Sequence, residues 1–280
     1  MAKRHTCITL CALKFILDTI MKKSIAGFLS LAFVAFAPVH AIDVDEIISG
    51  YYENTGGTEA WSQLTGVKMI GEFNQGGMKF PFEIVNLKDG RQYMKFSFQG
   101  KEIKQGVFDG ETMWNTNFMT MKAEKSDAES TANQMLEIND FPSALFNYKE
   151  KGYTLELIGT EAVEGTDTYK LKLVKEPVTI DGNKVEDISF YYFDTEAFVP
   201  LVTEAEVKSG PAKGKIGESK LSDYQEVDGL YFPFSMTQGI KGGGGNASMI
   251  ITSIELNPTV SQSDFAMPAE EPAPAAEKAE

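Results

Sequence analysis

Histidine and cysteine are scarce in this chain of 280 residues, which has only two of each. All four lie before Ile42, at His5, Cys7, Cys11 and His40. If that segment is removed, the remaining chain has no Ser-His-Asp triad, no cysteine nucleophile and no zinc site built from His or Cys. We therefore expect neither an enzyme nor a metal site. The composition does not exclude a catalytic pair of carboxylates, as in glycosidases. A solvated acidic surface is the interpretation that the 40 acidic residues favour.

A long uninterrupted hydrophobic run is also missing. Residues 21–41 instead have the three-part layout of a secretory signal peptide, with Lys22 and Lys23 before an apolar run and Ala41 at the cut. The run covers about 14 residues, shorter than the roughly 20 that a membrane-spanning helix needs. We expect translation to begin at Met21, cleavage to follow Ala41, and the protein to be exported. Ile42 stands where a lipid anchor would need cysteine.

Positive charge is in short supply, since 26 Lys and Arg residues face 40 Asp and Glu residues, for a formal net charge of −14. Removal of residues 1–41 takes away five basic residues and one acidic residue, which changes this charge to −18. Such a chain repels nucleic acid and anionic membrane surfaces, so we expect no nucleic-acid partner. Without disulfides, a hydrophobic core must stabilise the fold, and 42% hydrophobic residues permit one.

Apolar and polar residues alternate from Val67 onwards, which is typical of half-buried strands. Gly76-Gly77 and Asp89-Gly90 separate the first of these runs as hairpin turns. Similar runs and turns recur as far as Leu256. The pattern predicts a mainly β (α+β) fold with about eleven antiparallel strands, as a sheet or a barrel.

Helices are predicted at two places. Apolar residues at helical spacing follow Ile42, with acids in the first turn; Gly56-Gly57 ends this helix, and a short helical turn carries Trp61. The second place is an insert among the strands, at residues 122–151.

Two signals define helices within the insert. Ser126 and Glu129 form a capping-box pattern, which predicts a helix through Leu136. Pro142 is expected to start a second helix. Beyond the strands, the Pro/Ala/Glu-rich residues 269–280 are expected to be a disordered tail, which leaves residues 42–268 as the folded domain.

Large apolar side chains gather on one face of three neighbouring strands, and a tryptophan follows them. Two interpretations remain open: an ordinary core under the helices, or a cavity for a lipid or acyl chain, because Met and Phe repack around ligands of varied shape. The candidate ligand-binding residues are Met69, Phe73, Phe80, Phe82, Met94, Phe96, Phe98 and Trp114.

Several segments, in this order and spacing, resemble the outer-membrane lipoprotein-sorting family of LolA/LolB-like proteins. The resemblance covers most of residues 45–268. It rests on Tyr51–Gly57, Phe108–Trp114, Tyr191–Glu196 with Val199–Leu201, Asp223–Phe234 and Phe265–Pro268.

The resemblance implies an open antiparallel half-barrel of about eleven strands with a helical lid. It also implies a periplasmic carrier or chaperone that binds the acyl chains of a lipoprotein or another lipid. We expect this protein to be a monomer without a cofactor. An envelope transporter or an outer-membrane acceptor would then be its partner. The alternative function is a non-catalytic structural or interaction domain of a cell-envelope complex, with a filled core.

Arg91 is the only arginine after residue 41. Carriers of this family use one arginine on an early strand to latch the helical lid, so the resemblance implies this role for Arg91. Gln92 follows it, where the family usually has proline. An exposed charge at the edge of a strand is the other interpretation of Arg91.

Overall fold

The computed structural model describes residues 42–98, 100–244 and 246–269. Contacts within the chain divide it after Ala41, and the fold below is that of the unit that begins at Ile42. The predicted signal peptide at residues 21–41 lies outside the described residues, as does all but the first residue of the predicted tail at 269–280.

Thirteen strands form a single antiparallel sheet in the described part of the chain. They are β1 (Gly66–Gln75), β2 (Met78–Leu87), β3 (Gln92–Phe98), β4 (Lys101–Phe108), β5 (Met113–Thr116), β6 (Ala123–Lys125), β7 (Thr154–Val163), β8 (Thr166–Ile180), β9 (Asn183–Asp194), β10 (Pro200–Glu206), β11 (Ile216–Val227), β12 (Leu230–Ile240) and β13 (Ala247–Leu256).

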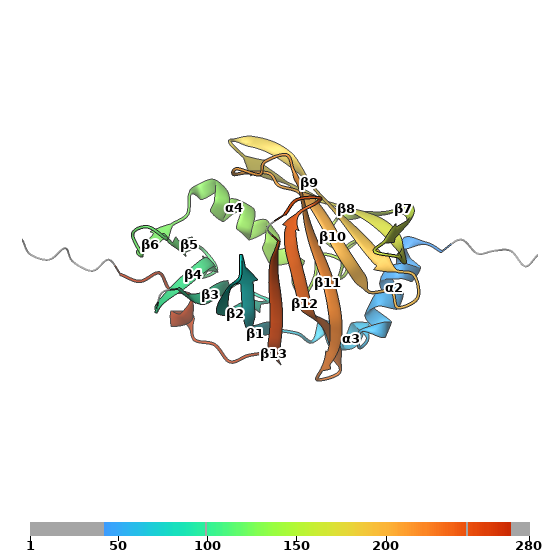
Figure 1. The fold of residues 1–280 in the computed structure, drawn as a ribbon, viewed down its shortest axis with the longest axis horizontal. Helices are drawn as coiled ribbons and strands as arrows, with labels where there is room; N and C mark the ends of the chain where they lie inside the picture. The colour runs from blue at the N-terminus through green and yellow to red at the C-terminus, as the bar shows by residue number, and fades with distance from the viewer. Residues whose placement is uncertain (1–41, 99, 245, 270–280) are drawn as a thin grey trace, which may run out of the picture. The chain divides into compact units, whose positions relative to one another are not determined.

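The strands follow one another as two meanders that meet where β1 pairs with β13. The spatial order runs from β6 through β1 and β13 to β7, so β6 and β7 are the two edges and the sheet is not closed into a barrel. Figure 1 shows the resulting curved, open sheet. The prediction of an open antiparallel half-barrel is therefore confirmed, although the sheet has thirteen strands and not about eleven.

Three α-helices accompany the sheet in the described residues: α2 (Val44–Asn54), α3 (Thr58–Ser62) and α4 (Ala128–Glu137), with 3-10 turns η1 (Ile138–Asp140) and η2 (Gln262–Asp264). A capping box starts α2, since the Glu46 amide donates to Asp43 at 2.9 Å and the Asp43 amide donates back at 3.1 Å. None of the helices in the described ranges is both long and apolar enough to cross a membrane.

Residues 126–153, here called the lid, connect edge strand β6 to edge strand β7 and contain α4 and η1. Because its two ends belong to opposite edges of the sheet, this segment must cross from one edge to the other. In Figure 1, α4 lies on the concave side between the two halves of the sheet. The chain order of the strands thus produces the lid directly.

Two details of the predicted insert are wrong. The side chain that caps α4 is Asp127 and not Ser126; it accepts from the Ser130 amide at 2.7 Å. The helix expected from Pro142 is a series of turns, in which Asn147 has a φ of 52°. Tertiary packing determines the conformation of this segment, because the consecutive side chains of Leu145 and Phe146 are both buried in the core.

The main core lies on the inner face of the sheet, which is the face that packs against α2, α3 and the lid. Its buried residues come from these helices and from both halves of the sheet, for example Ile47, Trp61, Phe82, Leu171 and Phe232. A single apolar layer therefore joins the first and last strands to the helices.

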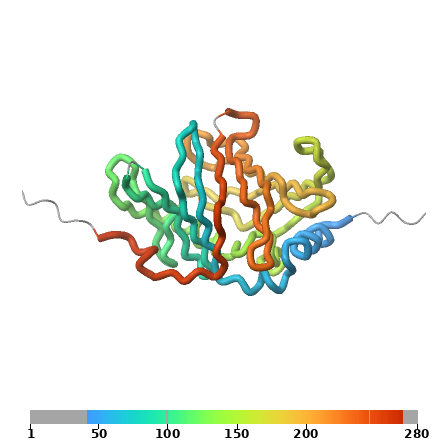
Figure 2. The backbone as a smooth tube through the Cα atoms, turned by 60° about the horizontal axis from the view of Figure 1, so that its bottom comes forward, coloured from blue at the N-terminus to red at the C-terminus, as the bar shows by residue number. Residues whose placement is uncertain are grey.

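A second, smaller cluster lies on the other side of the first strands. This outer cluster consists of Val85, Leu87, Tyr93, Val107, Trp114 and Phe265. Phe265 comes from the segment after β13, which runs back beside the strands of the first meander (Figure 2). Hydrogen bonds hold this segment, from the Trp114 indole to the Phe265 carbonyl at 2.9 Å and from Lys104 to the Asp264 carbonyl at 2.8 Å.

Candidate functional site

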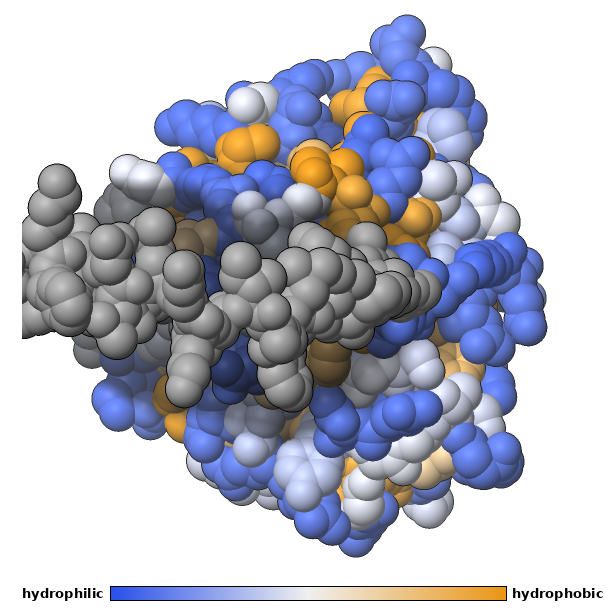
Figure 3. Space-filling view, turned by 90° about the vertical axis from the view of Figure 1, so that its right-hand side faces the viewer, coloured by the Kyte–Doolittle hydropathy of each residue, from blue (hydrophilic) through white to orange (hydrophobic). Residues whose placement is uncertain are grey.

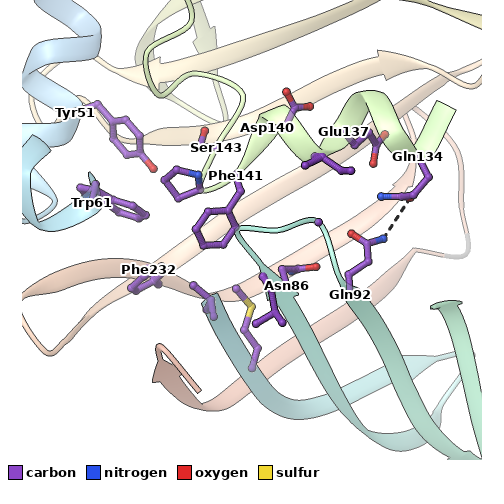
Figure 4. Close-up of a pocket in the computed structure, with 16 residues that line it drawn as sticks. Tyr51, Trp61, Asn86, Gln92, Gln134, Glu137, Asp140, Phe141, Ser143 and Phe232 are labelled. Atoms are coloured by element: carbon purple, nitrogen blue, oxygen red, sulfur yellow. Dashed lines mark hydrogen bonds between the residues drawn. The ribbon is translucent and has the colours of Figure 1, made fainter. Parts of the chain in front are cut away.

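A pocket of about 320 Å³ lies between the inner face and the lid. Its walls come from α2, α3, strands β1, β2, β3 and β12, and the lid (Figure 4). The lining residues are Tyr51, Trp61, Val67, Met69, Asn86, Leu87, Gly90, Gln92, Gln134, Glu137, Ile138, Asp140, Phe141, Pro142, Ser143 and Phe232.

One end of the pocket is aromatic. Tyr51, Trp61 and Phe232 lie together at this end in Figure 4, with Phe141 beside them. The Trp61 and Phe232 rings are 5.1 Å apart, and the Trp61 indole donates to the Thr55 carbonyl at 3.1 Å. Burial raises the pKa of Tyr51, so its hydroxyl stays neutral at physiological pH. These rings form a rigid apolar wall.

The other end of the pocket is polar and belongs mainly to α4 and β3. The Gln92 amide nitrogen donates to the Gln134 side-chain oxygen at 3.3 Å, which joins β3 to the lid (Figure 4). Gly90 permits the close approach of the lid here. It has a φ of +88°, and an added Cβ would lie 2.5 Å from Cγ1 of Ile138.

Hydrogen bonds also hold the lid to the second half of the sheet. The Asn133 amide donates to the Thr179 carbonyl at 2.7 Å, and the Thr179 amide donates back to Asn133 at 2.8 Å. The carboxylate of Glu129 accepts from the amides of Asp181 and Gly182, both at 2.8 Å. Helix α4 is thus fixed to the turn between β8 and β9 as well as to β3.

A partly buried ion network holds the lid where η1 ends. Lys175 donates to Asp140 at 2.6 Å and lies 3.2 Å from Asp187, which also pairs with Lys208. Burial alone would lower the pKa of Lys175, but hydrogen bonds to the two carboxylates outweigh it and raise that pKa. Asp140 also accepts from the Tyr153 hydroxyl at 2.8 Å. The network therefore connects the lid to β8 and β9.

Of the candidate ligand-binding residues, only a part lines the pocket. Met69 lines the pocket. Phe82 is buried in the inner-face core, and Phe73, Met94 and Phe96 pack against that core while partly exposed. Phe80 lies beside Phe96 and Phe98, with ring centroids 6.3 and 5.9 Å away, and none of these three rings lines the pocket.

Trp114 does not share a face with the other candidates. It belongs to the outer cluster and is 2% exposed. On β4, Ile103 pairs with Phe96 and Val107 pairs with Trp114. The pairing of β3 with β4 contains a bulge between these two positions of β4. The bulge changes which side chains of β4 face inward. Alternation alone cannot reveal that change, so the sequence placed Trp114 on the wrong side.

Arg91 does not latch the lid. Its guanidinium donates to Asp89 at 3.0 Å and to the Gln262 side chain at 2.8 Å, and it lies 5.1 Å from the centre of the Phe265 ring. It therefore holds the C-terminal segment on the outer side of the sheet. The bond to the lid is made by the next residue, Gln92, which is the first residue of β3.

Replacement of Arg91 by alanine is expected to loosen the C-terminal segment and leave the lid unchanged. The amides of Phe265 and Ala266, which donate within η2, should exchange faster with deuterium, whereas those of α4 should not. Gln92→Ala serves as the matched control and should give the opposite pattern. Faster exchange in α4 of Arg91→Ala would contradict this assignment.

Sequence reasoning missed most of the pocket lining. Tyr51, Trp61 and Phe232 lie within or near the segments that carry the family resemblance, but their spacing gives no sign that they meet. Glu137 and Gln134 are ordinary helix residues in sequence. In the described ranges, no group of three His, Cys, Asp or Glu side chains has the arrangement of a metal site.

Figure 3 shows the side of the molecule on which α2 and β7 lie, where grey atoms do not cover it. Most of the visible surface is hydrophilic, and apolar patches lie between the polar residues.

Comparison with protein-family models finds no match, and comparison with curated protein sequences finds none either. Among solved structures, a LolA superfamily protein from Nitrosomonas europaea shares 12% identity with a TM-score of 0.49, over 81% of this chain and 98% of that chain. An outer membrane lipoprotein-sorting protein domain from Vibrio parahaemolyticus also shares 12% identity with a TM-score of 0.49, over 79% and 94%.

The chain resembles LolA-like proteins. A DUF1329 family protein from Desulfovibrio piger is similar as well, with 13% identity and a TM-score of 0.43 over 81% of this chain and 98% of that chain. The open antiparallel sheet with a helical lid, which the resemblance of the sequence segments implies, is the architecture observed.

Proposed function

We propose that this protein is an exported carrier that binds the acyl chains of a lipoprotein or another lipid between the sheet and the lid. Residues 42–268 would form the carrier, working in the periplasm after removal of residues 1–41. The observation that carries the proposal is the aromatic-walled pocket of about 320 Å³ under the lid. Its volume falls within the range of about 300–1,000 Å³ typical of small-molecule sites.

Binding would depend on apolar burial and on movement of the lid, with no covalent step. Burial of each methylene is worth about 0.8 kcal/mol, so affinity should rise roughly fourfold per methylene while the chain fits. Polar contacts attach the lid to the sheet at Gln92, at Thr179 with the following turn Asp181-Gly182, and at Lys175. Their release would widen the pocket for longer or branched chains.

The decisive test is a substitution on β1 that fills the pocket with a larger side chain. Met69→Trp adds bulk to a lining residue and is expected to weaken binding of a fluorescent fatty acyl probe at least tenfold, a loss of about 1.4 kcal/mol. Binding is measured by fluorescence titration of the purified protein.

Ile70→Trp provides a matched control, because Ile70 is the next residue on the same strand and is 39% exposed on the other face. It should leave probe affinity unchanged. Equal affinity in both variants, with thermal unfolding showing both folded, would contradict the proposal. Absence of probe binding by the unmodified protein, together with no lipid extracted from it, would favour an interaction domain with a filled core.

A further inference from the structure

The pocket has two chemically different ends, which suggests more than general affinity for lipid. Tyr51, Trp61 and Phe232 form the aromatic end, whereas Gln92, Gln134 and Glu137 lie at the opposite end in Figure 4. A ligand that fills both ends is an amphiphile, with its chain against the rings and its head group near α4. The polar end therefore decides which head group is accepted.

Glu137 is the one charged lining residue without a protein partner in the described structure. Its carboxylate forms no hydrogen bond and no ion pair there, whereas Asp140, the other acidic lining residue, is bound by Lys175 and Tyr153. Glu137 is exposed to solvent, yet desolvation by the surrounding protein raises its pKa, assisted by Asp140 and Asp187 and opposed by Lys175 and Lys208. Its charge is thus accessible and not neutralised by direct contact.

The position of Glu137 in its helix is unfavourable for a carboxylate. It is the last residue of α4, and the last turn contains no basic residue. The carbonyl groups at the end of a helix carry partial negative charge, which repels anions and attracts cations, by about 0.3–1 kcal/mol at exposed sites. A cation beside Glu137 would satisfy both the carboxylate and the helix end.

The remaining polar groups at this end also suit a hydrogen-bond donor. The Gln92 amide nitrogen is already used, since it donates to Gln134 and to the Gly106 carbonyl. The side chain of Asn86, also in the lining, forms no hydrogen bond within the described residues. Among the described residues, the lining contains no lysine and no arginine, so an anionic head group would meet an unpaired carboxylate and no basic lining residue.

We propose that the pocket selects amphiphiles that carry a protonated amine, whose ammonium group is bound by Glu137 while the alkyl chain lies against Trp61, Phe141 and Phe232. This inference rests on the proposed carrier function and specifies the head group of its ligand. The ammonium ion would donate to the carboxylate of Glu137, with Asn86 within the same pocket as a further acceptor.

The test compares three probes with the same alkyl length, decylamine, decanol and decanoate, by isothermal titration at neutral pH. The amine is expected to bind about tenfold more tightly than the alcohol, and decanoate to bind most weakly. Glu137→Gln is expected to remove most of the preference for the amine while binding of decanol stays unchanged. Circular dichroism confirms that the variant is folded.

Glu156→Gln is the matched control, because Glu156 is an exposed acid on β7 outside the pocket. The chain is acidic, with a net charge of −14, so both variants reduce general attraction of amines equally, and only Glu137→Gln should abolish the preference. An equal loss in both variants, or equal affinity of amine and alcohol in the unmodified protein, would overturn this inference and leave the carrier function intact. Failure of all three probes to bind would overturn the carrier function itself.

Discussion

Replacement of Phe265 by alanine is expected to lower the free energy of unfolding by about 3–5 kcal/mol. Phe265 is fully buried in the outer cluster, 5.4 Å from the Tyr93 ring between ring centres. Its removal leaves a cavity beside Trp114 and Val107 and takes away the ring that Arg91 covers. Denaturant unfolding followed by tryptophan fluorescence measures the loss, and Trp114 reports on the site directly.

Met267→Ala is the control for Phe265→Ala, since it lies two residues further along the same segment and is 36% exposed. Its effect should stay within about 0.5 kcal/mol, as for most surface substitutions. Similar losses in the two variants would mean that the segment contributes through its backbone and not through Phe265. Ligand binding should be unaffected by either variant, because neither Phe265 nor Met267 lines the pocket.

Replacement of Asp140 by alanine is expected to cost about 2–4 kcal/mol and to loosen the lid. The substitution removes one of two carboxylates from Lys175, which is 14% exposed, and leaves the hydroxyl of Tyr153 without its acceptor. Tyr153 itself is 5% exposed. Thermal unfolding gives the stability loss, and hydrogen exchange in η1 shows whether the lid opens more often.

Asp45→Ala is a chemically matched control for this network. Asp45 also accepts from a lysine and a tyrosine, Lys149 and Tyr148, but its ion pair is more than half exposed on both sides. Solvent screening makes exposed pairs weak, so this variant should lose much less stability. An equal loss in both variants would show that burial of the Lys175 network contributes nothing.

The pH dependence of the network follows from two opposite shifts. Desolvation raises the pKa of Asp187, but contacts with Lys208 and Lys175 outweigh this effect and leave that pKa below its usual value. The contribution of Asp187 to the free energy of unfolding is therefore present above about pH 4 and is lost as pH falls through the folded pKa. The raised pKa of Lys175 makes its contribution complete below about pH 10.4 and lost above it. The cost of Asp140→Ala should therefore be constant between pH 5 and 9.

Local sequence signals predicted the regular parts of the fold. Acids in the first turn and the glycines at 56 and 57 predicted the helix that is observed as α2. Asp89-Gly90 marks the turn between β2 and β3, where Gly90 has the left-handed φ of +88°. Such signals succeed because capping and turn formation depend on residues within four positions of one another.

Local sequence signals gave wrong predictions where contacts between residues far apart in the sequence determine the structure. Residues 142–146 carry a helix-start signal and yet form turns, because Leu145 and Phe146 are both drawn into the core. Trp114 faces outward because the β3–β4 pairing contains a bulge. Arg91 was expected at the lid, yet Gln262, 171 residues away in sequence, accepts its hydrogen bond.

The sequence alone determined an acidic chain whose histidines and cysteines all precede Ile42, with alternating strands, hairpin turns, an interrupting insert and an excess of Met and Phe on three strands. Tertiary structure alone decided that the insert joins the two edges of one sheet and covers an amphipathic pocket. It also decided that Glu137 faces that pocket without a partner among the residues that the structure describes. The physical reason is that periodicity fixes which way a side chain points along its own strand or helix, whereas a pocket depends on which distant elements meet.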